Sequence, residues 1–545
     1  MKLLNNFPGV PRSMQVDALQ EIEEAIRADK KFIILCAPTG SGKSHIAATL
    51  ALSCKKPPKN FIDMIDDRTI YQRDEYKGYH NKDQAYKCGN HRGIVLTVSK
   101  ALQDQYKSIF SDSVELLKGK SNYPCALEPT FGCDLSYCSS DPKIAEQCVN
   151  ASKCEYYNAK DKALKNIFSV MNYSMALSLP DHLMQSEFLI CDEASELEDE
   201  LISHFSVSLN YKQLETIFKT PIPKLLSEDP KDAMKWLSDL AVKLKSEYDF
   251  FMANFNRAKG KNKKRLLKEI KNYRYIRNIW DKSILLLANW YKSEIIIECT
   301  AESVELTPLT INNLSKSLFD RAKHVILLSA TIIDPSHFAK QLGIDDYEYI
   351  ELESTFDFKK SPIYCGAAKY SLSYDNIDKN LPKVIDQVEK LCKHYTANKG
   401  LIHTHNFKIN EAIRSRFSGQ TRFIYRQAGT NNEQLIKLHN SRIDPTVLVS
   451  PSLVFGTDLP DDLGRFQIVV KLPYMPLGSK RIKTLFDRDK DWYQNKMLTG
   501  LVQACGRCTR HVNDFADTFI LDGQIVRVLK ANWHKLPKFF KDRIH

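Results

Sequence analysis

The feature that most constrains this chain is a glycine-rich loop between an apolar run and a helical stretch. The segment Ala37-Pro-Thr-Gly-Ser-Gly-Lys-Ser44 follows the strand-like run Phe32–Cys36 and precedes an apolar helix. Gly40 and Gly42 permit a tight turn whose backbone N–H groups point inward, as in loops that hold nucleotide phosphates. Ala37 occupies the first position, where the general motif has glycine. The sequence therefore predicts a nucleoside-triphosphate site in an α/β domain.

The residue types of the loop and of a later strand predict how ATP and Mg²⁺ would be held. We expect Lys43 to reach the β and γ phosphates and the Ser44 hydroxyl to hold Mg²⁺. The apolar run Phe188–Cys191 leads into Asp192, which is expected to be the second magnesium ligand, and Glu193, which is expected to polarise the attacking water. The nucleotide-binding residues predicted from the loop are Thr39, Gly40, Ser41, Gly42, Lys43 and Ser44.

Length and charge limit the class of protein. A chain of 545 residues is too long for one hydrophobic core, so several domains are expected. Its net charge of +12 suits a polyanionic partner. No stretch reaches the roughly 20 apolar residues that span a bilayer, and the start of the chain lacks the apolar core of a signal peptide. We expect a cytoplasmic protein, or one of the host cytoplasm if its source is viral, with no membrane partner.

Apolar runs alternate with helical stretches in two parts of the chain, which predicts two parallel α/β sheets. Between them, residues 197–320 are rich in Leu, Lys and Tyr at helical spacing, which predicts a helical insertion. Within it, residues 257–277 hold ten Lys or Arg and one acid, Glu269. These residues form either a solvated helix or a track for phosphates. The expected strands are Phe32–Cys36, Ile94–Val98, Phe188–Cys191, Val325–Ser329, Gly400–Thr404, Val447–Ser450 and Gln467–Val470.

A set of motifs in a fixed order resembles superfamily-two helicases. Asp192-Glu-Ala-Ser195 is similar to the DEAH box, with Ser195 in place of the histidine that couples the ATP site to the second domain. By resemblance, Arg12 and Gln15 bind on the adenine side, and Asp458 contacts the nucleotide. The further segments that resemble the family are Thr97–Gln105 (motif Ia), Leu328–Ile332 (motif III), Gly400–His405 (motif IV), Phe455–Leu459 (motif V) and Gln503–Arg510 (motif VI).

Motif VI is predicted to supply the arginines of catalysis. Arg507 and Arg510 are three residues apart, so they share one face if the segment is helical. From the second domain they are expected to stabilise charge on the γ-phosphate, with ATP binding closing the cleft. Gln503, about one helical turn earlier, is expected to sense the phosphate or the water.

Five cysteines within thirty residues predict a metal site: Cys125, Cys133, Cys138, Cys148 and Cys154. Four thiolates suit an iron–sulfur cluster or zinc. The spacing does not form paired C-x₂-C units, which favours the cluster. The pair Cys505 and Cys508 lies inside motif VI and is interpreted as packing.

The position and flanks of this cluster resemble the DinG-like branch of the XPD-like iron–sulfur DNA helicases. The resemblance implies a [4Fe–4S] cluster held by Cys125, Cys138, Cys148 and Cys154, with Cys133 as the alternative to Cys138. It also implies a helical arch, movement 5′→3′ on single-stranded DNA, and forked duplex DNA as substrate, with RNA left open. We expect a monomer. Tyr123, Tyr157 and Phe407 are candidates for stacking on bases, although aromatic residues more often belong to a core.

The fold implied is two RecA-like P-loop domains, with an Fe–S insertion and an arch insertion in the first. The expected boundaries are 1–117, 159–200 and 321–334 for motor domain 1, 118–158 for the Fe–S domain, 201–320 for the arch and 335–545 for motor domain 2.

Three alternatives to a helicase differ in what the chain would do. One is a DNA or RNA translocase that does not separate strands. Another is a nucleic-acid-binding structural protein with an inactive ATPase. This alternative is disfavoured by the intact residues Lys43, Asp192, Glu193, Arg507 and Arg510. A third is a nuclease–helicase fusion, which is not expected because only residues 1–36 precede Ala37. The motifs do not identify a pathway, of which DNA repair is one example.

Overall fold

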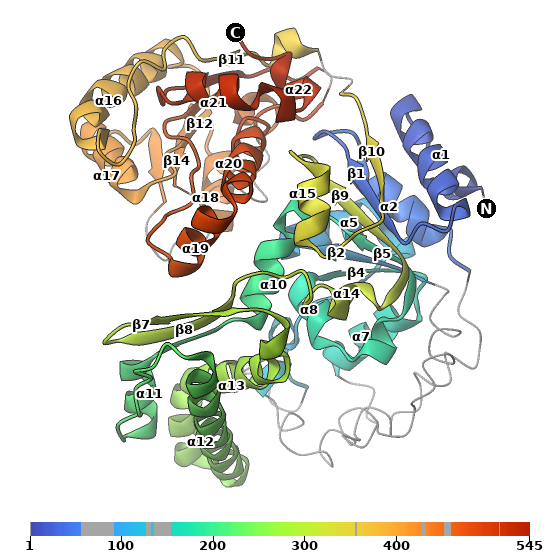
Figure 1. Cartoon of the computed structure of the whole chain (residues 1–545), viewed down its shortest axis with the longest axis vertical. Helices are drawn as coiled ribbons and strands as arrows, with labels where there is room; N and C mark the ends of the chain where they lie inside the picture. The colour runs from blue at the N-terminus through green and yellow to red at the C-terminus, as the bar shows by residue number, and fades with distance from the viewer. Residues whose placement is uncertain are drawn as a thin grey trace. The chain divides into compact units, whose positions relative to one another are not determined.

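The structure, a computed structural model, describes the chain except for residues 1, 56–91, 127–131, 136–153, 355–356, 427–431, 452–458 and 512. The chain divides into two compact units (Figure 1). Unit 1 comprises Met1–Ile34, Ser44–Leu328 and Phe338–Glu348, and unit 2 comprises Leu35–Lys43, Ser329–His337 and Tyr349–His545. Most of the first sheet belongs to unit 1, and the whole second sheet belongs to unit 2.

The first sheet has seven strands in the order β10-β1-β9-β5-β2-β4-β3. The pairs β2–β4, β2–β5, β3–β4 and β5–β9 are parallel. Strands such as β2 are buried along their whole length, as expected for a sheet covered on both faces. The bounds are β1 Phe32–Cys36, β2 Gly93–Thr97, β3 Glu115–Leu117, β4 Phe168–Asn172, β5 Ser186–Cys191, β9 Ala322–Ser329 and β10 Glu348–Glu351.

Local capping explains where several helices of this region begin. The Ser99 hydroxyl accepts a hydrogen bond from the N–H of Leu102 at the start of α5, and the Asn172 amide oxygen accepts one from the N–H of Met175 at the start of α8. The helices are α1 Ser13–Arg27, α2 Lys43–Leu52, α5 Lys100–Phe110, α7 Glu155–Lys165, α8 Tyr173–Ser178, α9 Asp181–Met184, α10 Leu197–Phe205, α14 Lys316–Phe319 and α15 Pro335–Gln341.

The insertion after α10 contains a long helical hairpin and a small sheet (Figure 1). Asp229 caps α12 (Pro230–Arg257), with Pro230 at its first position. Helix α13 (Gly260–Asn289) packs against α12, and the rings of Phe251 and Tyr273 stack between them at 3.4 Å. The rest of the insertion is α11 (Tyr211–Phe218) and an antiparallel sheet of β6 (Val207–Asn210), β8 (Ser303–Pro308) and β7 (Ile295–Cys299).

The sequence predicted the helices of this insertion but not its sheet. The run Ile295–Ile297 is short and apolar, and a short apolar run does not by itself distinguish a strand from a buried helical turn. Pairing with β8, across the short connection Thr300–Glu302, decides the outcome.

The second sheet has six strands in the order β11-β16-β15-β12-β14-β13, and all neighbours are parallel. One face is covered by α16 (Ile377–His394) and α17 (Phe407–Arg416), and the other by α20 (Lys490–Ala504) and α21 (Ile525–Asn532). The other elements are β11 Ile363–Tyr364, β12 Gly400–His403, β13 Phe423–Tyr425, α18 Asn432–Ser441, β14 Val447–Ser450, β15 Phe466–Val469, α19 Lys480–Arg488, β16 Asp517–Ile520 and α22 Lys538–Lys541. The prediction of two parallel α/β sheets is confirmed.

Candidate nucleotide site and cysteine cluster

The glycine-rich loop has the backbone geometry that phosphate binding requires. It connects β1, which ends at Cys36, to α2, which begins at Lys43. Gly40 and Gly42 have φ angles of 79° and 82°, a region where a side chain would be strained. The Lys43 ammonium donates to the carbonyl oxygen of Ala37 at 3.0 Å, so it lies over the loop. A loop of this shape at a helix N-terminus is an anion site.

The acidic pair predicted at the end of β5 lies directly beyond Cys191. The Asp192 side chain is buried, with 4% of its surface exposed. Its Oδ1 accepts a hydrogen bond from the N–H of Glu193 at 3.0 Å, which orients the carboxylate. Glu193 has a φ of 53°, in the left-handed region that non-glycine residues rarely occupy. Such backbone strain is typical of functional sites.

A buried tyrosine joins the two predicted magnesium ligands of unit 1. The Tyr106 hydroxyl, from α5, donates to Oδ2 of Asp192 at 3.0 Å, and it also forms a hydrogen bond with the side chain of Ser44. Burial raises the pKa of Tyr106 well above its usual value, and the neighbouring Asp192 carboxylate adds to the shift. The structure thus brings Ser44 and Asp192 to one hydroxyl group. Sequence reasoning missed Tyr106, because no motif marks its position.

The residues predicted for the adenine side lie in the N-terminal segment. Gln15 is buried, and its side-chain oxygen accepts the N–H of Arg12 at 2.9 Å, which fixes the start of α1. Phe7 stacks on His45 of α2 with 5.9 Å between ring centroids. Burial lowers the pKa of His45, and the nearby Arg12 charge lowers it further. Arg12 and Phe7 therefore both lie near His45, in the first turn of α2.

The expectation that Arg507 and Arg510 lie on one helical face is wrong. Helix α20 ends at Ala504, so Gln503 is in its last turn, whereas both arginines follow in an irregular segment. Gly506 is a poor helix former, and the segment makes other backbone hydrogen bonds: the carbonyl of Arg507 accepts the N–H of Leu459 at 3.2 Å. The arginines are held by this loop within unit 2 and not by helical spacing.

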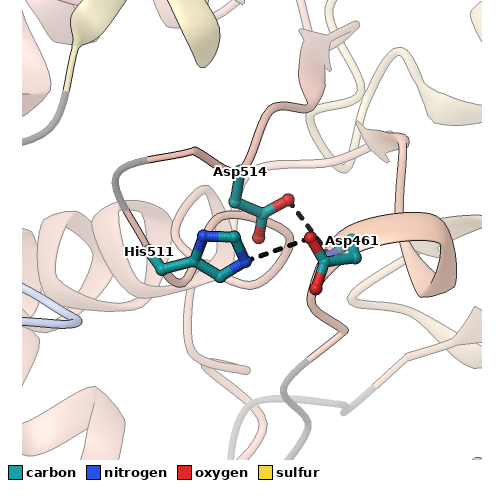
Figure 2. Close-up of side chains that lie close together, drawn as sticks. All are labelled: Asp461, His511 and Asp514. Carbon is teal, nitrogen blue, oxygen red and sulfur yellow. Dashed lines mark hydrogen bonds and ion pairs between the residues drawn. The ribbon is translucent and has the colours of Figure 1, made fainter.

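The loop after motif VI is anchored by the cluster of Asp461, His511 and Asp514 that Figure 2 shows. His511 Nε2 lies 3.0 Å from Oδ1 of Asp461. The Asp514 carboxylate is 1% exposed, and Arg465 Nη1 donates to it at 3.0 Å. It also accepts backbone hydrogen bonds from the N–H groups of Asp461, Arg510 and Phe515. Because the guanidinium and these N–H groups already satisfy the carboxylate, we assign the cluster to anchoring the loop.

The histidines of motif IV are neutral at physiological pH. His403 ends β12 and is 1% exposed, and burial lowers its pKa well below the usual value. Burial also lowers the pKa of His405 to about 4. Neither side chain therefore offers a positive charge to a phosphate. Asp458 of motif V lies outside the described residues.

Three of the five clustered cysteines lie in the described part of the chain, and all three are buried: Cys125, Cys133 and Cys154. The sulfur atoms of Cys133 and Cys154 are 3.9 Å apart. Cys133 and Cys154 therefore lie close enough to belong to one metal site. Cys138, which its place in the sequence favoured over Cys133 as a ligand, lies outside the described residues, as does Cys148.

The cysteine-rich segment contacts the basic helix of the insertion. Arg274 Nε of α13 lies 2.7 Å from Oδ2 of Asp134, the residue after Cys133. Of the aromatic residues proposed to stack on bases, Tyr123 packs on Tyr156 at 5.7 Å, and Tyr156 packs on Tyr157 at 5.4 Å. Phe407 is exposed over 53% of its surface. Tyr123 is therefore part of local packing, whereas Phe407 is accessible.

The buried pair Cys505 and Cys508 consists of free thiols that belong to the hydrophobic clusters of unit 2. Burial raises the pKa of each to about 12, so both stay protonated. In the part of the chain that the structure describes, no helix has the length and apolar character needed to cross a membrane.

Comparisons with known proteins agree with the motifs. The family described as helicase C-terminal domain matches residues 388–543, and the family described as type III restriction enzyme, res subunit, matches residues 9–223. The ATP-dependent DNA helicase YoaA of Escherichia coli (strain K12) is 23% identical, with 96% of this chain and 93% of YoaA covered.

Solved structures of XPD helicases share the fold. One has a TM-score of 0.64 at 16% identity and covers 97% of this chain and 98% of its own. Xpd4 of S. tokodaii has a TM-score of 0.56 at 14% identity, with 98% and 100% covered. The chain is therefore homologous to the DinG-family helicase YoaA and has the fold of the XPD helicases.

Proposed function

We propose that the chain is an ATP-dependent DNA helicase that moves along single-stranded DNA and separates duplexes. Homology to helicases supports the activity class. The observation that supports the site most directly is the convergence of Ser44 and Asp192 on Tyr106, at the end of the phosphate loop. A hydroxyl and a carboxylate are the ligands expected for magnesium beside ATP.

Each site residue has a proposed role in hydrolysis. Lys43 and the N–H groups of the loop would hold the β and γ phosphates, while Ser44 and Asp192 would hold Mg²⁺, which would neutralise charge on the phosphates. Glu193 orients and polarises the attacking water. Arg507 and Arg510 stabilise charge that develops on the γ-phosphate, and Gln503 senses the phosphate or the water. Arg12 and Gln15 bind on the adenine side, with Asp458 as a further nucleotide contact.

We also propose that the buried cysteines hold a [4Fe–4S] cluster. When bound, such a cluster would cross-link the cysteine-rich segment, whose sequence has little periodicity. Cys125, Cys148 and Cys154 are three proposed ligands. The contact between Cys133 and Cys154 supports Cys133 as the fourth ligand, with Cys138 as the alternative.

The neighbourhood of the cysteines supports a nucleic-acid channel. Helix α13 is basic, and Arg274 joins it to the cysteine-rich segment. A row of basic side chains suits the phosphate backbone of a nucleic-acid strand. The direction of movement, 5′→3′ on single-stranded DNA, is proposed from the family resemblance. A translocase that does not separate strands would use the same residues.

The experiment that tests the ATP site is hydrolysis of ATP with and without single-stranded DNA. Replacing Lys43 by alanine removes the charge beside the phosphates, so hydrolysis should fall by about 100-fold or more. Circular dichroism of Lys43→Ala should match that of the wild type. Hydrolysis that persists in this variant would show that the phosphate-loop assignment is wrong. Equal stimulation by RNA would favour the translocase with a broader substrate.

A further inference from the structure

Tyr106 occupies a rigid position in the middle of α5. Its side chain is 1% exposed. The ring packs on Phe110 at 5.9 Å and meets Phe168 edge to face at 6.3 Å. Packing of this kind restricts a side chain to one rotamer, so the hydroxyl is held at a fixed point.

The Tyr106 hydroxyl has a distinct partner on each side. It donates its hydrogen to Oδ2 of Asp192 at 3.0 Å. The hydroxyl also forms a hydrogen bond with the Ser44 side chain. Because its one hydrogen goes to Asp192, the Ser44 hydroxyl is the donor of this second bond. Two consecutive hydrogen bonds therefore connect Ser44 through Tyr106 to Asp192.

These two hydrogen bonds determine which lone pairs of the Ser44 and Asp192 oxygens face away from the tyrosine. When the Ser44 hydrogen points to Tyr106, the lone pairs of its oxygen are directed elsewhere. The bond from Tyr106 and the N–H of Glu193, which donates to Oδ1 at 3.0 Å, together set the plane of the Asp192 carboxylate. Both oxygens are thereby oriented as ligands for a hard cation.

We infer that Tyr106 is a positioning residue that orients Ser44 and Asp192 for the divalent cation that accompanies ATP. The inference rests on the proposed role of these two residues as magnesium ligands. Tyr106 itself is not a ligand in this scheme. Its hydroxyl determines how tightly the site takes the metal, whereas the ring belongs to the core.

A second buried tyrosine provides a matched control. Tyr173 is also fully buried, and its hydroxyl donates to the main-chain oxygen of Asp192 at 2.9 Å. Tyr106→Phe and Tyr173→Phe each remove one buried hydroxyl that bonds to Asp192 and leave the ring in place. Only Tyr106→Phe removes the bond to the carboxylate.

The test uses the full chain and measures the Mg²⁺ requirement in two ways. One is the free Mg²⁺ concentration that gives half-maximal ATP hydrolysis, and the other is the affinity for a fluorescent ATP analogue with Mg²⁺ and with EDTA. For Tyr106→Phe we expect the half-maximal Mg²⁺ concentration to rise about tenfold, because a hydrogen bond to a charged group is lost. The affinity of Tyr106→Phe for the ATP analogue should fall about tenfold with Mg²⁺ and should stay unchanged in EDTA. Tyr173→Phe should shift either value less than twofold.

Three outcomes would overturn the inference. The first is an unchanged Mg²⁺ requirement in Tyr106→Phe, and the second is an equal shift in both variants. The third is a loss of folded protein in Tyr106→Phe, which would assign the hydroxyl to stability. Further support would come from Tyr106→Phe having a smaller effect in a Ser44→Ala background, since coupled residues are not additive. If the wild type itself failed to hydrolyse ATP, the proposed function would fail instead.

Discussion

The carboxylate of Asp514 determines the path of the backbone at Arg510. Its Oδ2 accepts the N–H of Arg510 at 3.0 Å, and its Oδ1 accepts Arg465 Nη1 at 3.0 Å. Asp514 is 1% exposed, so its negative charge is buried. The positive charge of Arg465 compensates that buried charge. A catalytic role for Arg510 therefore depends on a residue that sequence motifs do not include.

Asp514→Asn should destabilise the chain and reduce ATP hydrolysis. The amide N–H₂ of asparagine would face N–H donors, so buried donors would lose their acceptor. This should lower the free energy of unfolding by about 1.5–3 kcal/mol. The measurement is the midpoint of thermal unfolding together with DNA-stimulated ATPase. Asp462→Asn is the control, because Asp462 also bonds Arg465 at 3.0 Å but its side chain is 96% exposed. If both variants lowered the midpoint equally, the anchoring role of Asp514 would be refuted.

At the residue scale, the sequence predicted the parts of the site that lie within one motif. The glycines at 40 and 42 and the pair Asp192 and Glu193 follow from local chemistry. The role of Tyr106 could not be predicted from the sequence, because its partner Asp192 is 86 positions away and only packing brings the two together. The prediction that Arg507 lies on a helix was wrong. Gly506 and the hydrogen bonds of the loop end the helix before Arg507, although the residue spacing fits a helix.

Among the elements, regular strands were easier to predict than the cysteine-rich segment. The expected strands Val447–Ser450 and Val325–Ser329 match β14 and the end of β9, because a fully buried parallel strand is a continuous apolar run. The sheet of β6, β8 and β7 was missed because its pairing joins segments on either side of the long helical hairpin. The cysteines give a different signal, since their spacing indicates a metal but not which thiols approach one another.

Iron content should distinguish the ligands of the proposed cluster. With protein purified anaerobically, Cys154→Ser and Cys133→Ser should each lose iron and labile sulfide, because each removes one thiolate. Cys138→Ser should retain them, and Cys299→Ser, which changes an exposed thiol, serves as the control. Cys154→Ser should also impair strand separation more than ATP hydrolysis. Loss of iron in Cys138→Ser with full retention in Cys133→Ser would restore the assignment that the sequence favoured, and zinc in place of iron would exclude the cluster.

At the scale of the whole molecule, the proposed function needs two parallel α/β units and a nucleic-acid partner. Most of the first sheet lies in unit 1, and the second sheet lies in unit 2. The net charge of +12 and the basic helix α13 suit a phosphate backbone. Homology to the DNA helicase YoaA supports a motor that couples ATP hydrolysis to movement on DNA.

The measurement that tests this account most directly is ATP-dependent separation of a DNA duplex with a single-stranded 5′ tail, beside a duplex with a 3′ tail. Lys43→Ala serves as the inactive control. We expect the wild type to separate the 5′-tailed duplex alone and the variant to separate neither. Separation of the 3′-tailed duplex alone would contradict the proposed direction, and strong DNA-stimulated hydrolysis without separation of either duplex would contradict the helicase and indicate a translocase.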